Sequence, residues 1–188
     1  KTLVQGAAIG VLAKTKNPKY SPLFEKSLSS VSNSVKANAI AGLAETSPEK
    51  VASLLEKVDL ENADESVMDK LLPIIVKNKI VSQMPNIAQT VAFYPFIAFQ
   101  NPNLAQPAEE GFNWIMDSDN IKAVEKLTGI LKQVKAQIGD NPQAKMMIRD
   151  ILKKGLDRKM KVFRENPSNQ SLNSQVELIN KTVEAYNE

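Results

Sequence analysis

The sequence predicts an all-α fold of about ten helices that stack as antiparallel pairs. Ala, Leu, Lys, Glu and Gln, which all favour helices, are plentiful among the 188 residues, whereas glycine occurs only seven times. No segment shows the sustained apolar–polar alternation with β-branched residues that is typical of strands. Proline directly after Ser or Asn, as at Ser47-Pro48 and Asn141-Pro142, repeatedly marks a helix start.

Capping residues and apolar periodicity together set the expected helix boundaries. The helices are expected near residues 2–15, 21–30, 33–45, 48–57, 64–78, 80–92, 107–117, 120–138, 142–165 and 169–187. On 120–138 one arc holds the apolar residues Val124, Leu127, Ile130, Leu131, Val134 and Ile138, so this helix should have one exposed side. Residues 33–45 are small or apolar almost all round, which predicts an inner helix of a stacked array.

The length and the N-terminus bear on the domain organisation. We expect residues 1–188 to form a single α-helical, repeat-like domain. The chain opens with Lys1 rather than Met and is helical from the start, so we expect it to be a fragment of a larger chain. The longest apolar run, from Val91 to Phe99, is too short for the roughly 20 residues of a membrane span.

Histidine and cysteine are both absent from the chain, and this excludes many kinds of site. Zinc helices of the H-E-x-x-H type, cysteine zinc sites, thiol catalysis and Ser-His-Asp triads all need one of these residues. The scattered glycines form no phosphate-binding loop. We therefore expect no catalytic, cofactor-binding or metal-binding residue in this chain. The cysteine count does not indicate a compartment, and both cytoplasm and periplasm are compatible with it.

Carboxylates are the remaining candidates for chemistry. Glu109-Glu110 and Asp117 lie near expected helix ends, where acids usually satisfy backbone N–H groups and the helix dipole. A small all-α enzyme that uses Asp117 or Glu110 is the alternative interpretation. The acidic group Asp59, Glu61, Asp64 and Glu65 lacks the spacing and the glycine of a calcium loop, so a linker or helix start is expected there.

A stretch of 29 residues, 80–108, contains no Asp, Glu, Lys or Arg. Aromatic residues gather in it, and Phe93, Tyr94, Phe96 and Phe99 are candidates for an interface. Three interpretations are open: a buried hub where two halves of the domain meet, an interface with a partner, and a small-molecule pocket. The segments around Pro102 and Pro107 are expected to be exposed loops.

Residues 145–164 form a basic segment with eight cations and two acids. Most of the charges lie opposite the apolar arc, so a solvated face is expected. Arg149 and Lys159 are the exceptions, because an ideal helix turns them toward the apolar side. Arg149 is a candidate for contact with a substrate or with another domain, since its planar guanidinium binds carboxylates in a bidentate manner. No aromatic residues alternate with the cations, so nucleic acid is not an expected partner.

The sequence "SVKANAIAGLAETSPEKV", residues 34–51, resembles segments in the C-terminal helical domain of bacterial zinc aminopeptidases of the aminopeptidase N type, in the gluzincin family. The resemblance implies a right-handed superhelix of stacked antiparallel pairs, HEAT- or armadillo-like. In that family the zinc and the catalytic residues lie in an upstream catalytic domain, and the helical domain covers the active-site mouth and restricts access to peptide N-termini. No catalytic motif of the family occurs here.

The resemblance implies a non-catalytic C-terminal domain of a zinc aminopeptidase. Its partners would be the upstream catalytic domain of the same chain and, through the parent enzyme, the peptide substrate. Zinc is expected only in the parent catalytic domain, and no cofactor in this fragment. The alternative is a free-standing HEAT-like scaffold that binds other proteins.

Overall fold

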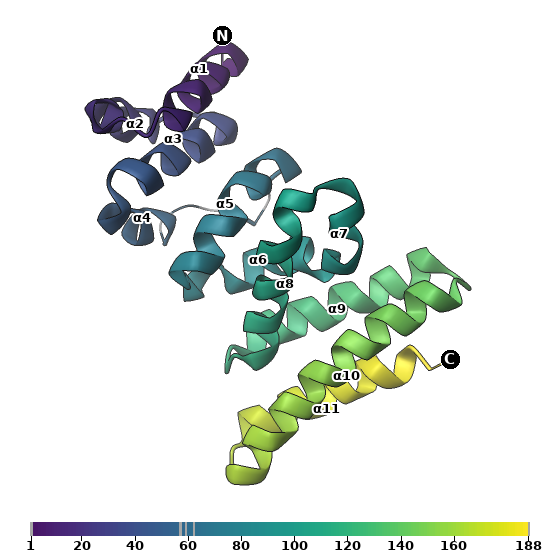
Figure 1. Ribbon diagram of the computed structural model, residues 1–188. Coiled ribbons are helices and arrows are strands. Elements are labelled where there is room, and N and C mark those ends of the chain that lie inside the picture. Colours follow the sequence, from purple (N-terminus) through teal and green to yellow (C-terminus); the bar gives the residue numbers. More distant parts are fainter. Residues whose placement is uncertain (1, 57, 59, 62, 188) are drawn as a thin grey trace. The chain divides into compact units, whose positions relative to one another are not determined.

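The structure, a computed structural model, describes residues 2–56, 58, 60–61 and 63–187. Within these residues the regular structure is helical and no β-strand is present, which confirms the predicted all-α fold (Figure 1). The α-helices are α1 (Thr2–Lys14), α2 (Ser21–Ser27), α3 (Asn33–Thr46), α4 (Pro48–Leu55), α5 (Glu65–Asn78), α6 (Met84–Ala92), α7 (Tyr94–Gln100), α8 (Pro102–Asp117), α9 (Ile121–Ile138), α10 (Pro142–Glu165) and α11 (Gln170–Ala185). Two short 3-10 helices, Pro18–Tyr20 and Val81–Gln83, connect some of them.

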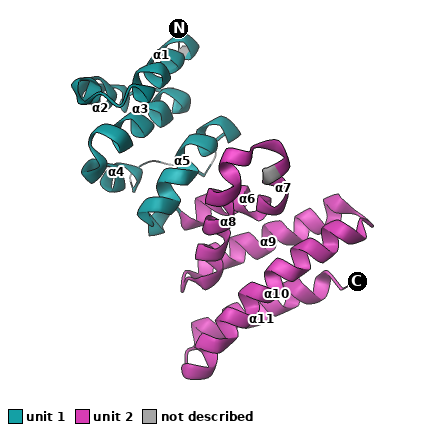
Figure 2. Ribbon diagram, in the orientation of Figure 1, with its two compact units in different colours: residues 1–83 teal, residues 84–188 magenta. Residues whose placement is uncertain are grey.

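The helices form two compact units, residues 1–83 and 84–188 (Figure 2). Helices α1–α5 belong to the first unit and α6–α11 to the second. The single domain over residues 1–188 and the right-handed superhelix both stay predictions.

Helix α3 is the centre of the first unit, where it packs against α1, α2, α4 and α5. Its residues Val35, Ile40 and Leu43 are fully buried, and so is Phe24 of α2. Gly42 lies directly beneath the Phe24 ring, where a Cβ atom would come within 2.6 Å of the ring carbons. The prediction that residues 33–45 form an inner helix covered on several sides is therefore confirmed.

Helices α6 and α9 form much of the core of the second unit. Helix α6 packs against α8 and α9, and α9 also packs against α11. The apolar arc predicted for α9 is buried from Val124 to Val134, whereas Lys122 and Lys132 are exposed. This confirms the predicted single exposed side of α9. The N-terminal half of the charge-free stretch thus contributes the core helix α6.

The segment around Pro102 and Pro107 corrects a prediction. Both were expected in exposed loops, with a helix beginning only at residue 107, but α8 begins at Pro102 and continues through Pro107. Pro102 occupies the first helical position, where its missing N–H group costs nothing. Leu104 and Ala108 are buried on the inner face, and this burial favours the helix over a loop.

Helix α7 was also not predicted. No helix is expected between residues 92 and 107, but α7 forms there with Pro95 in its first turn, where proline is well tolerated. Pro95 and Pro102 therefore lie in the first turns of helices, whereas Pro107 lies inside α8.

Candidate functional site

The most distinctive side chain of the second unit is Lys159, the only buried lysine among the described residues, with 3% of its surface exposed. It lies on α10 and points toward the ends of α8 and α11. Its Nζ donates to the backbone carbonyl of Ser118 at 2.6 Å and to Oε1 of Gln175, which is fully buried. Because Ser118 is the C-cap of α8, the ammonium lies where the helix dipole favours a cation. The expectation that Lys159 faces the apolar side is confirmed.

The adjacent Arg158 also binds the C-terminal end of α8, on its solvent-exposed side. Its Nε donates to Oδ1 of Asp117 at 2.8 Å, and its Nη2 donates to Oδ1 of Asn113 at 2.8 Å. Since Asn113 and Asp117 are one helical turn apart, the guanidinium spans the last turn of α8. We call Asn113, Asp117, Ser118, Arg158, Lys159 and Gln175 the α8–α10 polar cluster.

A small pocket of about 80 Å³ adjoins this cluster, and Asp117, Asp119, Arg158, Lys159, Val162 and Leu172 line it. It has room for about two or three water molecules. Burial lowers the pKa of Lys159 to about 8, against the opposite effect of the carboxylates of Asp119 and Asp117. An amine of low pKa can act as a base or nucleophile. Here, however, its hydrogen atoms are directed at two fixed acceptors, so the arrangement is that of a structural anchor.

Arg149, the predicted substrate-contact residue, lies outside this cluster, more than two turns nearer the start of α10. Its side chain is 30% exposed, and its Nε lies 3.5 Å from Oδ1 of the adjacent Asp150. That Nε atom is buried and has no hydrogen-bond partner. Because this unpaired Nε is buried, it offers no donor to an outside carboxylate, and a substrate or interdomain role for Arg149 stays a prediction.

The four aromatic interface candidates differ in exposure. Phe99 is 84% exposed, whereas Phe93, Tyr94 and Phe96 are partly buried. Tyr94 packs against the buried Phe112 with ring centroids 5.0 Å apart, and burial raises the pKa of its hydroxyl to about 12. Tyr94 thus contributes to the core, and Phe99 is the side chain of this group that is open to a partner. An interface role for the four stays a prediction.

The carboxylate candidates do not converge. Glu110 is on the exposed face of α8, in the middle of the helix, and accepts from Nε2 of Gln106 at 2.8 Å. Asp117 is paired with Arg158. Asp64 is the N-cap of α5: its Oδ1 accepts from the Ser66 hydroxyl at 2.7 Å and from Val67 N at 3.0 Å, and these two bonds, the first above all, lower the pKa of Asp64. The expected helix start at Asp64 is thereby confirmed, while Asp59 lies outside the described residues.

The part of the chain that the structure describes contains no group of three or more His, Cys, Asp or Glu residues that could hold a metal ion. In the same residues, no helix combines the length and the apolar character that a membrane crossing requires.

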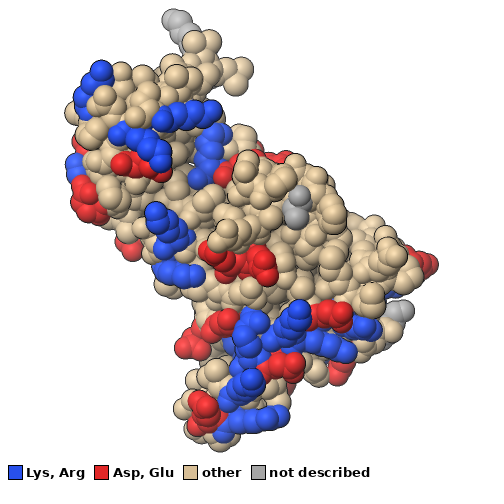
Figure 3. Space-filling view, viewed as in Figure 1, with Lys and Arg blue, Asp and Glu red and all other residues tan. Residues whose placement is uncertain are grey.

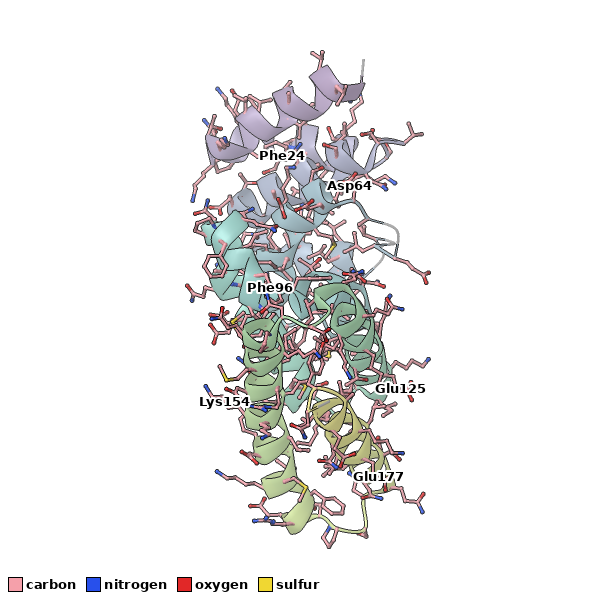
Figure 4. The ribbon with its side chains drawn as sticks, turned by 90° about the vertical axis from the view of Figure 1, so that its right-hand side faces the viewer. Phe24, Asp64, Phe96, Glu125, Lys154 and Glu177 are labelled. Carbon is pink, nitrogen blue, oxygen red and sulfur yellow. The ribbon has the colours of Figure 1, made fainter. Side chains whose placement is uncertain are left out.

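A larger groove runs between α10 and α11, with a volume of about 640 Å³. Its lining comprises the apolar Leu156, Met160 and Val176 and the polar Asp157, Lys161, Arg164, Glu177 and Asn180. Of these residues, Glu177 projects from α11 in Figure 4. The rim therefore carries both charge signs around an apolar floor, which suits a polypeptide better than a nucleic acid.

The basic segment of α10 forms a mixed surface. Lys153, Lys154, Lys161 and Arg164 are exposed, but Asp150 and Asp157 are exposed among them. Figure 3 shows blue and red side chains next to each other over the lower part of the molecule. Acid and base at four-residue spacing stabilise a helix, so these charges suit the predicted solvated face.

Three comparisons with known proteins give no relative: no family model, no curated protein and no solved structure matches the chain.

The α8–α10 polar cluster could be foreseen only in part. The helical periodicity of residues 142–165 indicates that Arg149 and Lys159 both face the apolar side of this helix. The partners of Lys159, which come from the end of α8 and from α11, left no signal in the sequence, because these contacts span 41 and 16 residues.

Proposed function

We propose that this chain is a non-catalytic helical domain of a zinc aminopeptidase, which covers the mouth of the active site and restricts access to peptide N-termini. The observation that carries the proposal is α3. The residues that resemble the aminopeptidase segment, 34–51, form a covered inner helix and the start of α4. The small residues Ala37 and Ala39 are buried, and at Gly42 a Cβ atom would come within 2.6 Å of the Phe24 ring.

The chemistry of the described residues supports a non-catalytic role. Lys159 is the most perturbed amine, and both of its acceptors are structural. The zinc of such an enzyme, which would polarise the scissile carbonyl and activate water, would be held by the catalytic domain. The contribution of this chain would be steric: a rigid helical wall with partly unpaired cationic groups such as Arg149.

The coding sequence upstream of Lys1 tests this proposal directly. We expect the reading frame to continue into a segment with an H-E-x-x-H motif, because that motif supplies two zinc ligands and a general base. A stop codon, or an initiation codon directly before Lys1, would refute the proposal.

The purified chain itself provides a second test. We expect it to retain no stoichiometric zinc after dialysis and to leave aminoacyl substrates uncleaved, because it has neither His nor Cys ligands. Metal analysis and a fluorogenic aminopeptidase assay measure this, with a known zinc aminopeptidase as the positive control. One tightly held equivalent of zinc would contradict the expectation.

The groove between α10 and α11 favours a second candidate, a free-standing scaffold that binds a polypeptide. In that case Met160→Glu, which places a charge on the apolar floor, should abolish capture of a defined partner. Met146→Glu is the matched control, because Met146 lies on the same helix, is 51% exposed and is not part of the groove lining. Equal capture by both variants would exclude the groove as the binding surface.

A further inference from the structure

We draw no further inference here: the strongest candidate, the groove between α10 and α11 with its apolar floor and its rim of both charge signs, fits any polypeptide of mixed charge, and nothing in the structure shows what covers it.

Discussion

Replacement of Lys159 by alanine is expected to lower the free energy of unfolding by about 3 kcal/mol near neutral pH. The substitution removes the Lys159 donor from the buried Oε1 of Gln175 and from the part-buried carbonyl of Ser118, and it opens a cavity beside the small pocket between α8 and α10. Removal of a buried charge offsets part of this loss, but the two lost hydrogen bonds and the lost packing outweigh it. Urea unfolding followed by circular dichroism measures the change.

Lys154→Ala is the matched control for this substitution. Lys154 lies on the same helix but is exposed and projects into solvent, so its loss should change stability by less than about 0.5 kcal/mol (Figure 4). If Lys159→Ala were as mild as Lys154→Ala, the anchoring of α8 and α11 by Lys159 would be refuted.

The same lysine predicts a dependence of stability on pH. Burial lowers its pKa from 10.5 to about 8, so between these values the unfolded chain binds more protons at this residue than the folded chain. The contribution of Lys159 to the free energy of unfolding therefore rises as the pH increases from 8 toward 10.5, and it is constant below pH 8. The difference in unfolding free energy between wild type and Lys159→Ala should widen by about 1–2 kcal/mol between pH 7.5 and 9.5.

Tyr94 and Tyr186 lower the absolute stability of both proteins at higher pH and cancel in the difference between them. Burial raises the pKa of each hydroxyl to about 12, so above pH 10 their ionisation in the unfolded chain lowers stability and opposes the effect of Lys159. A difference between wild type and Lys159→Ala that stays constant up to pH 9.5 would contradict the lowered pKa.

The direction of Lys159 shows what the sequence can predict about such a site. Helical periodicity decides on which face of α10 a residue lies. The sequence spacing of Lys159 from Ile148, Leu152 and Leu156 therefore places it on the apolar face. Which groups accept hydrogen bonds from the ammonium depends on the packing of α8 and α11 against α10. Periodicity within one helix carries no information about that packing.

Most of the helices follow from the sequence, but a proline does not always mark a loop. Pro102 and Pro107 suggested exposed loops, yet Pro102 lies at the beginning of α8 and Pro107 lies within α8. The competing effect was burial of Leu104 and Ala108, which secures the first turns of α8. Burial is a tertiary effect, and the helix propensities of single residues do not contain it.

Gly42→Ala is expected to lower the free energy of unfolding by about 2 kcal/mol, although alanine is the better helix former. Its Cβ atom would lie 2.6 Å from the ring of Phe24, which is fully buried between α2 and the rest of the first unit. The ring has no solvent-exposed direction in which to move, so the backbones of α2 and α3 must separate. Thermal or urea unfolding measures the loss.

Gly129→Ala is the matched control, because Gly129 is an exposed position inside α9 where a Cβ atom would meet no neighbouring group within 4 Å. There the helix propensity acts alone, and the substitution should stabilise the chain by about 0.5–1 kcal/mol. The two Gly→Ala substitutions should therefore change the free energy of unfolding in opposite directions. If both stabilised the chain, close contact between α2 and α3 at Gly42 would be excluded.

Shortening the opposing side chain separates a steric cause from any other. Phe24→Leu removes the ring carbons that a Cβ atom at residue 42 would meet, at the cost of a cavity. If steric overlap causes the loss at Gly42, Gly42→Ala should be less destabilising in the Phe24→Leu background than in the wild type, by at least about 1 kcal/mol. Strict additivity of the two substitutions would show that Gly42 is required for a reason other than the Phe24 ring.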